Sequence, residues 1–366
     1  MAKKTRVIDF GLAVVIGSDI NNSYKLFYRG RIVNKKVTFR VPCQKLLIYP
    51  YKHYMTNSAI PAIKLVGVSK LYPSKGVQAL KDINLEIQEG EFFALLGANG
   101  AGKTTLINIL TDLVTKTTGQ VEIKGVNTDK DFVTAKTYLG VVPQEFNFGI
   151  FDSCLDICVT QAGYYGISRA TAIPRAKQIL TDLGLGEKLT SPSRTLSGGM
   201  KRRLMIARSL MHNPQILILD EPTAGVDVQL RLGMWNYLQK INQENGVTIL
   251  LTTHYLEEVE ALCTRAAIIK DGEIVKLDTV KNLLHSADKE SYIIEFVPTP
   301  LVAQAVSNTS KFELVVIDEN SLEVEIGSKQ TINDLIQYLT TQKITVKSLR
   351  PKGNRLETLF INILKK

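Results

Sequence analysis

The chain has 366 residues, of which 45% are hydrophobic, 22% charged and 7% aromatic, so it has room for two or three globular domains with ordinary cores. Its formal charge of +10 is concentrated at the start, because residues 1–54 hold eleven Lys/Arg against two acids, a net +9 that leaves +1 for the rest. A near-neutral body argues against a general nucleic-acid surface, and the lack of an apolar run of about 18 residues argues against a membrane-spanning helix. Four cysteines without a paired Cys/His pattern argue against a zinc site and fit a reducing compartment.

Residues 1–54 differ from everything that follows. Basic residues alternate there with short β-like pieces at 25–28, 36–41 and 46–51. Met55 begins a stretch that resembles a natural N-terminus leading into the strand-like AIKLVGVSK. We therefore expect residues 1–54 to be a dispensable extension of the gene model. The alternative, a basic arm that touches anionic lipid, stays open.

Residues 62–285 alternate strand-like and helical patterns. Helical character dominates a stretch of about 145–210, which is rich in Ala and Leu. This order predicts an α/β core with a mainly parallel sheet and a helical subdomain inserted into it. The expected strands lie at 63–68, 83–88, 92–96, 121–125, 216–219, 247–252 and 266–269, and a helix is expected from Lys103 to about Thr111.

Residues 290–366 change character again. Strand-like YIIEFV, FELVVI, SLEVEI and ITVKSL are interleaved with a helical piece, the helix TINDLIQYL and a terminal amphipathic helix. This order is close to a β-α-β-β-α-β layout with a tail helix, and it predicts a small separate α+β domain.

A glycine-rich turn after the apolar run 92–96 is the strongest chemical motif. It reads G-x-x-x-x-G-K-T, with Gly97, Gly102, Lys103 and Thr104 at the defining positions. Backbone N–H groups of such a turn and the positive end of the helix that follows bind phosphate. Lys103 can reach the β- and γ-phosphates, and the Thr104 hydroxyl can hold Mg²⁺. The candidate phosphate-binding residues are Gly97, Ala98, Asn99, Gly100, Ala101, Gly102, Lys103, Thr104 and Thr105.

Two acids follow a second apolar strand at 216–219. Asp220 can bind Mg²⁺ through water, and Glu221 can polarise the water that attacks the γ-phosphate. Two acids after a strand mean little alone. Together with the glycine-rich turn they predict a P-loop ATPase.

A second anion site is predicted in TLSGGMKRRL. Ser197 is a good helix N-cap, and Gly198 and Gly199 leave backbone N–H groups open at the start of a helix. One γ-phosphate does not need two such sites in one chain, whereas two chains arranged head-to-tail do. The basic run 201–203 is interpreted as a solvated helix face.

At this point the sequence resembles the ATP-binding-cassette (ABC) ATPases, because LSGGM is similar to the family signature LSGGQ and the order and spacing of the motifs agree over roughly 62–280. Met200 departs from the usual Gln, with little consequence because the serine and the backbone amides carry the phosphate contact. The resemblance implies a P-loop NTPase cassette with a RecA-like core and a helical subdomain, using ATP and Mg²⁺.

The resemblance also implies roles for single residues. Glu221 matches the general base and Asp220 the acid on the metal side. His254, in TTHYLEE, matches the switch histidine that contacts the γ-phosphate, and Lys103 completes the catalytic set. Gln144, in VVPQE, resembles the glutamine that touches both Mg²⁺ and the membrane partner.

Further residues are assigned to binding by the same resemblance. Tyr72 resembles the aromatic residue that stacks on adenine. Asp227, in AGVD, resembles the acid of the loop that crosses the dimer interface. Ser197, Gly198 and Gly199 would act on the ATP of the partner chain.

Among ABC proteins, the ATPase subunit of a transporter is favoured. It would work at the cytoplasmic face of the membrane, peripherally, with an integral-membrane permease encoded separately and a second ATPase subunit, expected to be a copy of itself. The tail NRLETLFINIL resembles exporter ATPases of the multidrug, daunorubicin-resistance and nodulation-factor type, which favours export.

The alternative is a soluble ABC ATPase that acts on ribosomes or nucleic acid. Translation-type members usually carry two cassettes in one chain, whereas this chain carries one. Chromosome and DNA-repair members separate the phosphate loop from the signature by a long insert, and here only about 95 residues intervene.

Overall fold

The computed structural model describes the strands within residues 7–33 and residues 60–366, except 224–225, 286–288, 300, 303–305, 307–311, 328–329, 353–355, 358 and 361–366. It divides into two compact units, residues 1–55 and 56–366. The first unit contains four short antiparallel strands in the order β1-β2-β3-β4: Val7–Asp9, Ala13–Ile16, Lys25–Tyr28 and Arg31–Val33. Strand β3 confirms the β-like piece at 25–28, and those at 36–41 and 46–51 lie outside the described residues.

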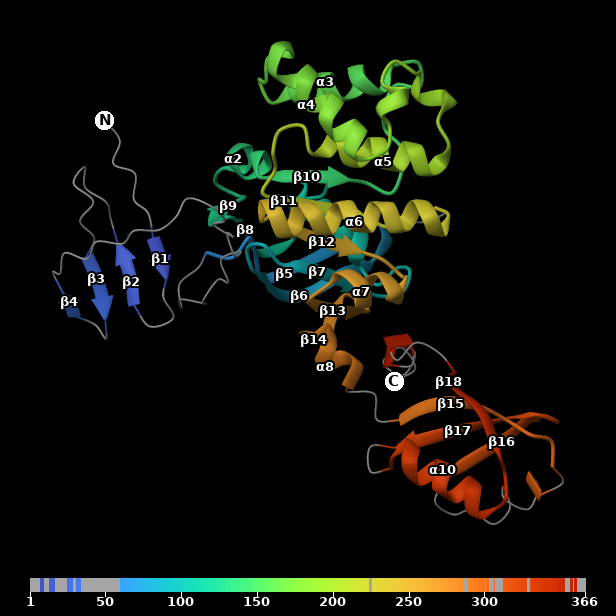
Figure 1. The fold of residues 1–366 in the computed structure, drawn as a ribbon. Coiled ribbons are helices and arrows are strands. Elements are labelled where there is room, and N and C mark those ends of the chain that lie inside the picture. The colour runs from blue at the N-terminus through green and yellow to red at the C-terminus, as the bar shows by residue number, and fades with distance from the viewer. Residues whose placement is uncertain are drawn as a thin grey trace. The chain divides into compact units, whose positions relative to one another are not determined.

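The second unit is built on a six-stranded sheet with the order β10-β11-β12-β7-β13-β14 (Figure 1). All neighbours are parallel except β14, which runs antiparallel to β13. Every residue of β7, β11 and β12 is buried, as expected for strands covered on both faces. The strands are β7 Phe92–Leu96, β10 Leu139–Val142, β11 Ile216–Asp220, β12 Thr248–Thr252, β13 Arg265–Lys270 and β14 Glu273–Thr279.

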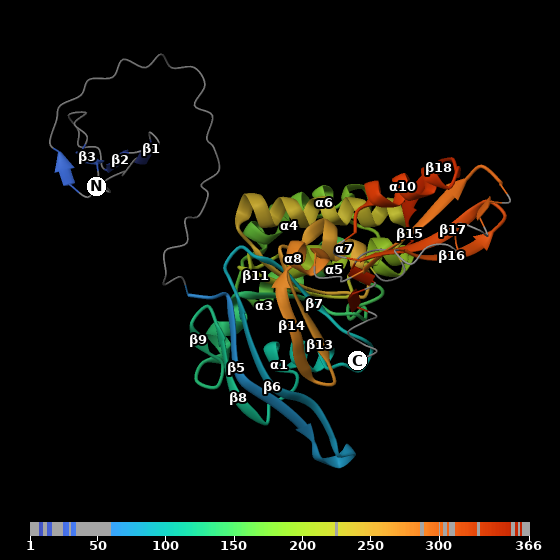
Figure 2. The same ribbon diagram turned by 90° about the horizontal axis from the view of Figure 1, so that it is seen from below.

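A second, antiparallel sheet covers one face of the first. Its order is β6-β5-β8-β9, and Figure 2 shows β5, β6 and β8 side by side. Alternate residues of β7 point to opposite faces: Phe93 and Leu95 pack toward the second sheet, and Phe92 toward the helices on the other side. The strands are β5 Ile63–Tyr72, β6 Val77–Ile87, β8 Thr118–Ile123 and β9 Val126–Asn127.

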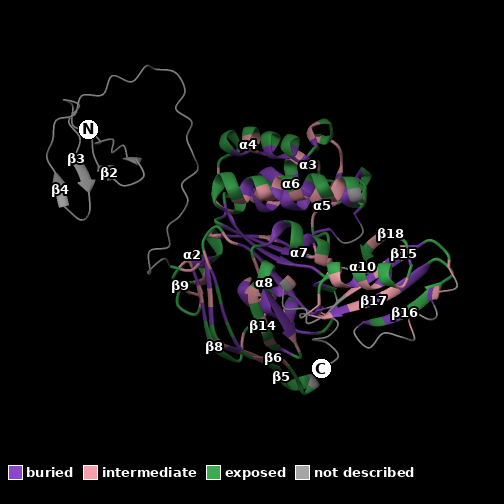
Figure 3. Ribbon diagram, turned by 60° about the horizontal axis from the view of Figure 1, so that its bottom comes forward, coloured by how far each residue is buried: buried purple, intermediate pink, exposed green. Residues whose placement is uncertain are grey.

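Helices α3 to α8 pack on the other face, and α3, α4 and α5 form the helical subdomain. Helices α1 and α2 pack on the side of the second sheet. Figure 3 shows the main-sheet strands buried and the outer sides of α4 and α6 exposed. The side-chain oxygens of Ser153, Ser168 and Ser197 cap α3, α4 and α5, so each begins at a hydroxyl residue. Helices lie at α1 Lys103–Leu110, α2 Phe132–Thr137, α3 Cys154–Tyr164, α4 Arg169–Asp182, α5 Gly198–Ser209, α6 Val228–Asn245, α7 Leu256–Leu262 and α8 Val280–His285, with 3-10 turns at Pro73–Lys75, Gly186–Lys188 and Ser193–Thr195.

The C-terminal part forms a four-stranded antiparallel sheet with its own apolar core. Its order, β16-β17-β15-β18, places the first strand of the domain at the centre. Helix α10, Ile332–Thr341, starts with a capping box between Thr331 and Asp334, which explains why the helix begins there. The expected helical piece before β16 and the terminal helix fall partly outside the described residues. The strands are β15 Lys289–Phe296, β16 Glu313–Asp318, β17 Ser321–Gly327 and β18 Val346–Pro351.

Within the part of the chain that the structure describes, no helix combines the length and the apolar character that are needed to cross a bilayer.

Candidate functional site

Four neighbouring parallel strands, β10, β11, β12 and β7, end at the same edge of the main sheet. The segments that follow them carry the predicted chemistry, and ligands bind outside this edge in open α/β sheets. A cavity of about 840 Å³ lies there, large enough for a nucleotide. Of the predicted site residues, it is lined by Gly97, Ala98, Asn99, Gly100, Gly102, Lys103, Thr104, Thr105, Gln144, Glu221 and His254.

The glycine-rich turn between β7 and α1 forms one wall of this cavity. A Cβ added at Gly97 would lie 2.6 Å from the carbonyl oxygen of Ile269, so only glycine fits. Gly102, the residue before α1, has φ 113° and caps the helix without a side chain. The first N–H groups of α1 therefore keep their hydrogen-bonding capacity and face the cavity with the positive end of the helix dipole. This donor set fits a polyphosphate.

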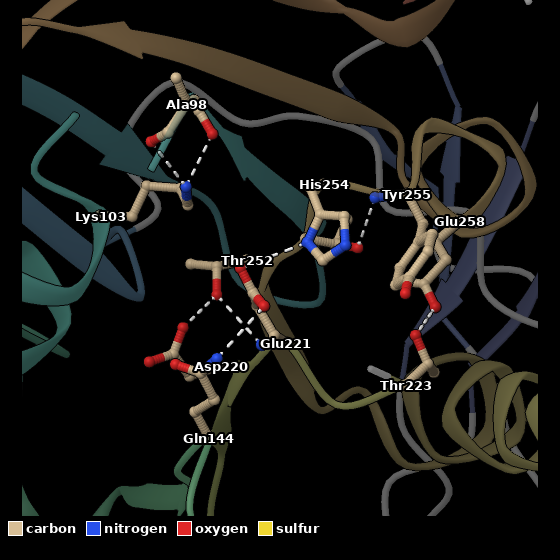
Figure 4. Close-up of polar contacts among 12 residues, drawn as sticks. Ala98, Lys103, Gln144, Asp220, Glu221, Thr223, Thr252, His254, Tyr255 and Glu258 are labelled. Atoms are coloured by element: carbon tan, nitrogen blue, oxygen red, sulfur yellow. Dashed lines mark hydrogen bonds and ion pairs between the residues drawn. The ribbon is translucent and has the colours of Figure 1, made fainter. Parts of the chain in front are cut away.

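Lys103, the first residue of α1, is buried above the turn. Its ammonium donates hydrogen bonds to the carbonyl oxygens of Gly97, at 2.7 Å, and Ala98, at 3.0 Å (Figure 4). Burial lowers the pKa of the ammonium, and the nearby charges of Glu221 and Asp220 oppose that shift. The cation is thus held at the turn where a phosphate would bind.

Asp220, at the end of β11, is buried behind the cavity wall. The Thr252 hydroxyl donates a hydrogen bond of 2.5 Å to its Oδ1, and burial raises the pKa of the carboxyl. Together with the Thr104 hydroxyl and the Gln144 amide, this carboxylate forms a set of oxygen donors that fits Mg²⁺. No group of three or more His, Cys, Asp or Glu gathers among the described residues, and Mg²⁺ bound with a nucleotide does not require one.

Glu221 occupies the centre of the polar cluster. Its backbone lies in the left-handed region, with φ 48°, and its N–H donates to the Thr252 carbonyl oxygen at 3.0 Å. Its carboxylate faces Nδ1 of His254 at 3.4 Å and Nε2 of Gln144 at 3.4 Å. Such a backbone conformation costs roughly 1–3 kcal/mol and persists only where surrounding contacts impose it. The arrangement can orient and polarise a water molecule.

Tyr72 is not among the residues that line the cavity. It ends β5 and pairs with Val77, which does line the cavity, and the ammonium of Lys70 lies 4.9 Å from the centre of its ring. Stacking on adenine therefore stays a prediction for this residue.

The predicted second anion site also lies outside this cavity. Ser197 caps α5 by accepting a hydrogen bond of 3.3 Å from the N–H of Met200, and Asp227 caps α6 by accepting one of 2.9 Å from Leu230. A Cβ added at Gly199 would lie 2.7 Å from Leu230, so the two helix starts are in contact. The structure groups these residues with one another and separates them from the cavity of their own chain.

The interpretation of 201–203 as a solvated helix face is wrong for Arg202. This side chain is 4% exposed, and it donates to the carbonyl oxygens of Pro143, at 2.8 Å, and Gln144, at 2.9 Å. Arg208, two turns later, donates to the carbonyl oxygen of Asn147 at 3.1 Å. The loop that carries Gln144 is therefore fastened to α5 by two arginines, because its carbonyls have no strand partner after β10 ends.

Sequence reasoning missed several residues of the site, which include Val77, Lys81, Thr252 and Phe360. The Thr252 hydroxyl donates to the Asp220 carboxylate and accepts from the backbone N–H of Glu221. The sequence signal for Thr252 was a polar residue at the end of an apolar strand, two residues before His254. Phe360 lines the cavity, although it lies near the C-terminus of the chain. Nothing in its local sequence indicates this position.

Comparisons with known proteins agree with this geometry. A protein-family model described as "ABC transporter" matches residues 80–224. The linearmycin resistance ATP-binding protein LnrL of Bacillus subtilis is 32% identical over 312 residues, which cover 81% of this chain and 96% of that protein. The chain belongs to the ABC transporter family. A relative named for import, the methionine import ATP-binding protein MetN of Clostridioides difficile, is 33% identical over 226 residues, covering 60% of this chain and 70% of MetN.

A solved structure of an ABC cassette has the same fold. It is the ATP-binding cassette MJ0796 in a dimeric post-hydrolysis state bound to ADP and Pi, 30% identical with a TM-score of 0.56, covering 60% of this chain and 98% of that chain. The predicted P-loop cassette with an α/β sheet is confirmed, and the protein is an ABC ATPase that binds and hydrolyses ATP.

Proposed function

We propose that this ATPase is the motor subunit of an exporter and drives a separately encoded permease from the cytoplasmic face of the membrane. The extent of the relatives' matches carries the proposal. A match that covers 81% of the chain and 96% of the resistance protein LnrL must extend beyond residue 285, into the C-terminal part of this chain. The import protein MetN matches only 226 residues, a length that the cassette alone can supply. The domain beyond the cassette thus favours the exporter type.

An exposed apolar surface on the helical side supports a protein partner. Phe146, Ile150 and Phe151 are 44%, 55% and 69% exposed within one short loop. The guanidinium of Arg194 lies 5.2 Å from the ring centre of Phe151, and the ammonium of Lys201 lies 5.9 Å from that of Phe146. A partner segment with apolar side chains and an acidic group would fit this surface. We assign it to the permease.

The same loop connects that surface to the nucleotide. Gln144, at its start, faces Glu221 in the cavity, and Arg202 and Arg208 hold the loop on α5. A displacement of the loop by the permease would therefore change the position of Gln144. This provides a physical route between membrane and ATP.

Two chains would bind two ATP molecules between them. The glycine-rich turn and Lys103 of one chain hold the phosphates, and Ser197, with the N–H groups of Gly198 and Gly199, closes the site from the other chain. The contact between the starts of α5 and α6 supports this role, because it places Asp227 on the same surface as Ser197.

In the closed site, Glu221 accepts a proton from the attacking water and His254 donates a hydrogen bond to the γ-phosphate. Mg²⁺, when bound, neutralises charge on the β- and γ-phosphates. Thr104, Gln144 and Asp220 would hold it through oxygen atoms. The hydrogen bond from Thr252 keeps Asp220 oriented for this contact.

The test is co-purification of the C-terminally tagged full chain from detergent-solubilised membranes. We expect a multi-span membrane protein in equal amount, and loss of it when Phe146 and Phe151 are replaced by Ser. Replacement of Val133, which is 80% exposed on α2, provides the control. Recovery of ribosomes or nucleic acid with the tagged chain, without any membrane protein, would contradict the proposal and support the soluble alternative.

A further inference from the structure

Between α6 and α7 the protein buries a carboxylate that the proposed mechanism does not use. Glu258 is 0% exposed and lies on α7, one turn after His254. Its Oε1 accepts hydrogen bonds from the hydroxyl of Thr223 and from the indole N–H of Trp235, the latter at 3.3 Å. Its Oε2 is buried and has no hydrogen-bond partner among the described residues. A half-satisfied buried carboxylate is costly to stability, which points to another role.

The partner of Glu258 lies on the loop that carries the catalytic base. Thr223 comes two residues after Glu221, and its carbonyl oxygen accepts the N–H of Val226 at 3.1 Å. The loop ends at Asp227, the cap of α6. The Thr223–Glu258 hydrogen bond therefore joins the segment after β11 to the segment after β12 (Figure 4).

This bond adds to two contacts nearer the strand ends. The Glu221 N–H donates to the Thr252 carbonyl oxygen at 3.0 Å, and the Glu221 carboxylate faces Nδ1 of His254 at 3.4 Å. Those two contacts hold the segment after β11 at Glu221, and the Thr223–Glu258 bond holds it at a second residue, which restricts its rotation about the first. The Thr223–Glu258 bond also lies deeper in the protein, away from the nucleotide cavity.

Helix α6 supports the histidine from a further side. The ring of Tyr255 lies 4.2 Å from that of His254, and the guanidinium of Arg231 lies 5.3 Å from the centre of the Tyr255 ring. Arg231 is in the first turns of α6, four residues after the cap residue Asp227. The Tyr255 ring therefore packs between His254 and the start of α6.

We propose that Glu258 is a positioning residue that acts through Thr223. It keeps Glu221 and Thr223 in one arrangement relative to His254, so that the base of one site and the Asp227 surface offered to the partner chain move together. The inference rests on the proposed roles of Glu221 and His254. It adds that hydrolysis in one site and closure of the dimer depend on the same buried hydrogen bond.

Matched substitutions of Thr223 and Glu258 test the proposal on the full chain. Thr223→Val removes the hydroxyl and keeps the shape, and Thr223→Ser keeps the hydroxyl. Glu258→Met removes the acceptor, and Glu258→Gln keeps one. We expect kcat for ATP hydrolysis to fall about tenfold or more in the Val and Met variants, because misplacement of catalytic groups by about 1 Å has effects up to 10²-fold. KM for ATP stays unchanged, and the Ser and Gln variants keep most of the activity.

Further measurements separate positioning from simple destabilisation. Thr223→Val with Glu258→Met should lower kcat no further than either change alone, since both remove one bond. Trp235→Phe, which leaves the Thr223 bond in place, should have a small effect. In a Glu221→Gln background, Thr223→Val should raise the ATP concentration needed for dimer formation.

Several results would overturn the proposal. These are wild-type kcat in Thr223→Val, an equal loss in Thr223→Ser and Thr223→Val, or a kcat loss that merely follows the folded fraction measured by thermal unfolding. If Glu258→Met does not fold, the Thr223 pair carries the test, because it changes one side-chain group. Wild-type ATPase activity in Glu221→Gln would contradict the assignment of the base, a failure visible independently of Thr223.

Discussion

Two helix starts in this protein, those of α1 and α5, use the same chemistry in different surroundings. Helix α1 follows Gly102, which has φ 113° and contributes no side-chain cap, and its first residues line the nucleotide cavity. Helix α5 follows Ser197, whose hydroxyl accepts the Met200 N–H, and its first residues do not line that cavity.

The difference separates a helix start that faces the nucleotide cavity of its own chain from one that lies outside that cavity. At α1 the uncapped N–H groups, Lys103 and the strand-end acids converge on one volume. At α5 one N–H is already satisfied by Ser197, and the remaining ones lie beside the start of α6. Two glycine-containing helix starts therefore lie in different surroundings, and the surroundings decide which groups each of them can contact.

The largest expected effect comes from Glu221, the proposed catalytic base, which lines the same cavity as the start of α1. Glu221→Gln should lower kcat by roughly 10²- to 10⁴-fold while ATP still binds, because an amide cannot accept the proton. ATP should then trap a dimer, visible as a shift in size-exclusion chromatography. Glu257→Gln on α7, whose side chain is 75% exposed, is the control and should behave as wild type. Unchanged ATPase activity in Glu221→Gln would refute the assignment.

The next effect concerns the cation at the α1 start. Lys103→Ala removes a charge-assisted hydrogen bond to phosphate, so ATP affinity should fall by about 1.5–3 kcal/mol, or roughly 10- to 150-fold. Titration calorimetry measures it. Lys81 also lines the cavity but pairs with Glu273 at 3.3 Å, and Lys81→Ala should have a much smaller effect. An equal loss of ATP affinity in both variants would contradict the assignment of Lys103 to the phosphates.

A pair of glycine substitutions compares the two turns directly. Gly97→Ala places a Cβ 2.6 Å from a backbone oxygen and should lower stability by about 1–3 kcal/mol together with ATP affinity. At Gly198 no atom lies within 4 Å of an added Cβ, so Gly198→Ala should keep both stability and ATP binding by the same chain, and impair only ATP-driven dimer formation. Urea unfolding measures the stability of the two variants, and ATP titration measures their affinity for ATP. Loss of ATP binding in monomeric Gly198→Ala would break the distinction.

The smallest effect is expected at the α5 cap. Ser197→Ala should lower the free energy of unfolding by about 1 kcal/mol through the lost cap. Ser197→Thr keeps a hydroxyl and should restore most of it. Dimer formation with ATP should weaken in the alanine variant, whereas ATP binding by the monomer should not change. Reduced ATP affinity of the monomeric Ser197→Ala variant would contradict the assignment of Ser197 to the ATP of the partner chain.

Much of the sheet could be predicted because its strands are continuous apolar runs. Strands β7, β11 and β12 lie where the sequence analysis expects them. Their sequences are continuously apolar because both faces of each strand are buried. The nucleotide turn was also predictable, because glycine is required wherever backbone and backbone approach closely, as at Gly97 and Ile269.

Long-range polar contacts could not be predicted. Arg202 looks like one of three adjacent basic residues, and only the fold brings it to the carbonyls of Pro143 and Gln144. Glu258 looks like one of several acids on a short helix, and only the packing of α6 on α7 buries it against Thr223. Phe360 reaches the cavity from the far end of the chain.

The sequence by itself determined the family, the nucleotide turn and the order of strands and helices, since these depend on local periodicity and on residue types with special backbone or phosphate-binding properties. Tertiary structure decided which polar groups meet. Parallel strands bring Gln144, Glu221 and His254 to one edge, although Gln144 and His254 are 110 residues apart in the sequence. It also decided which charges are buried, because desolvation depends on every element packed around a side chain and not on its neighbours in the chain.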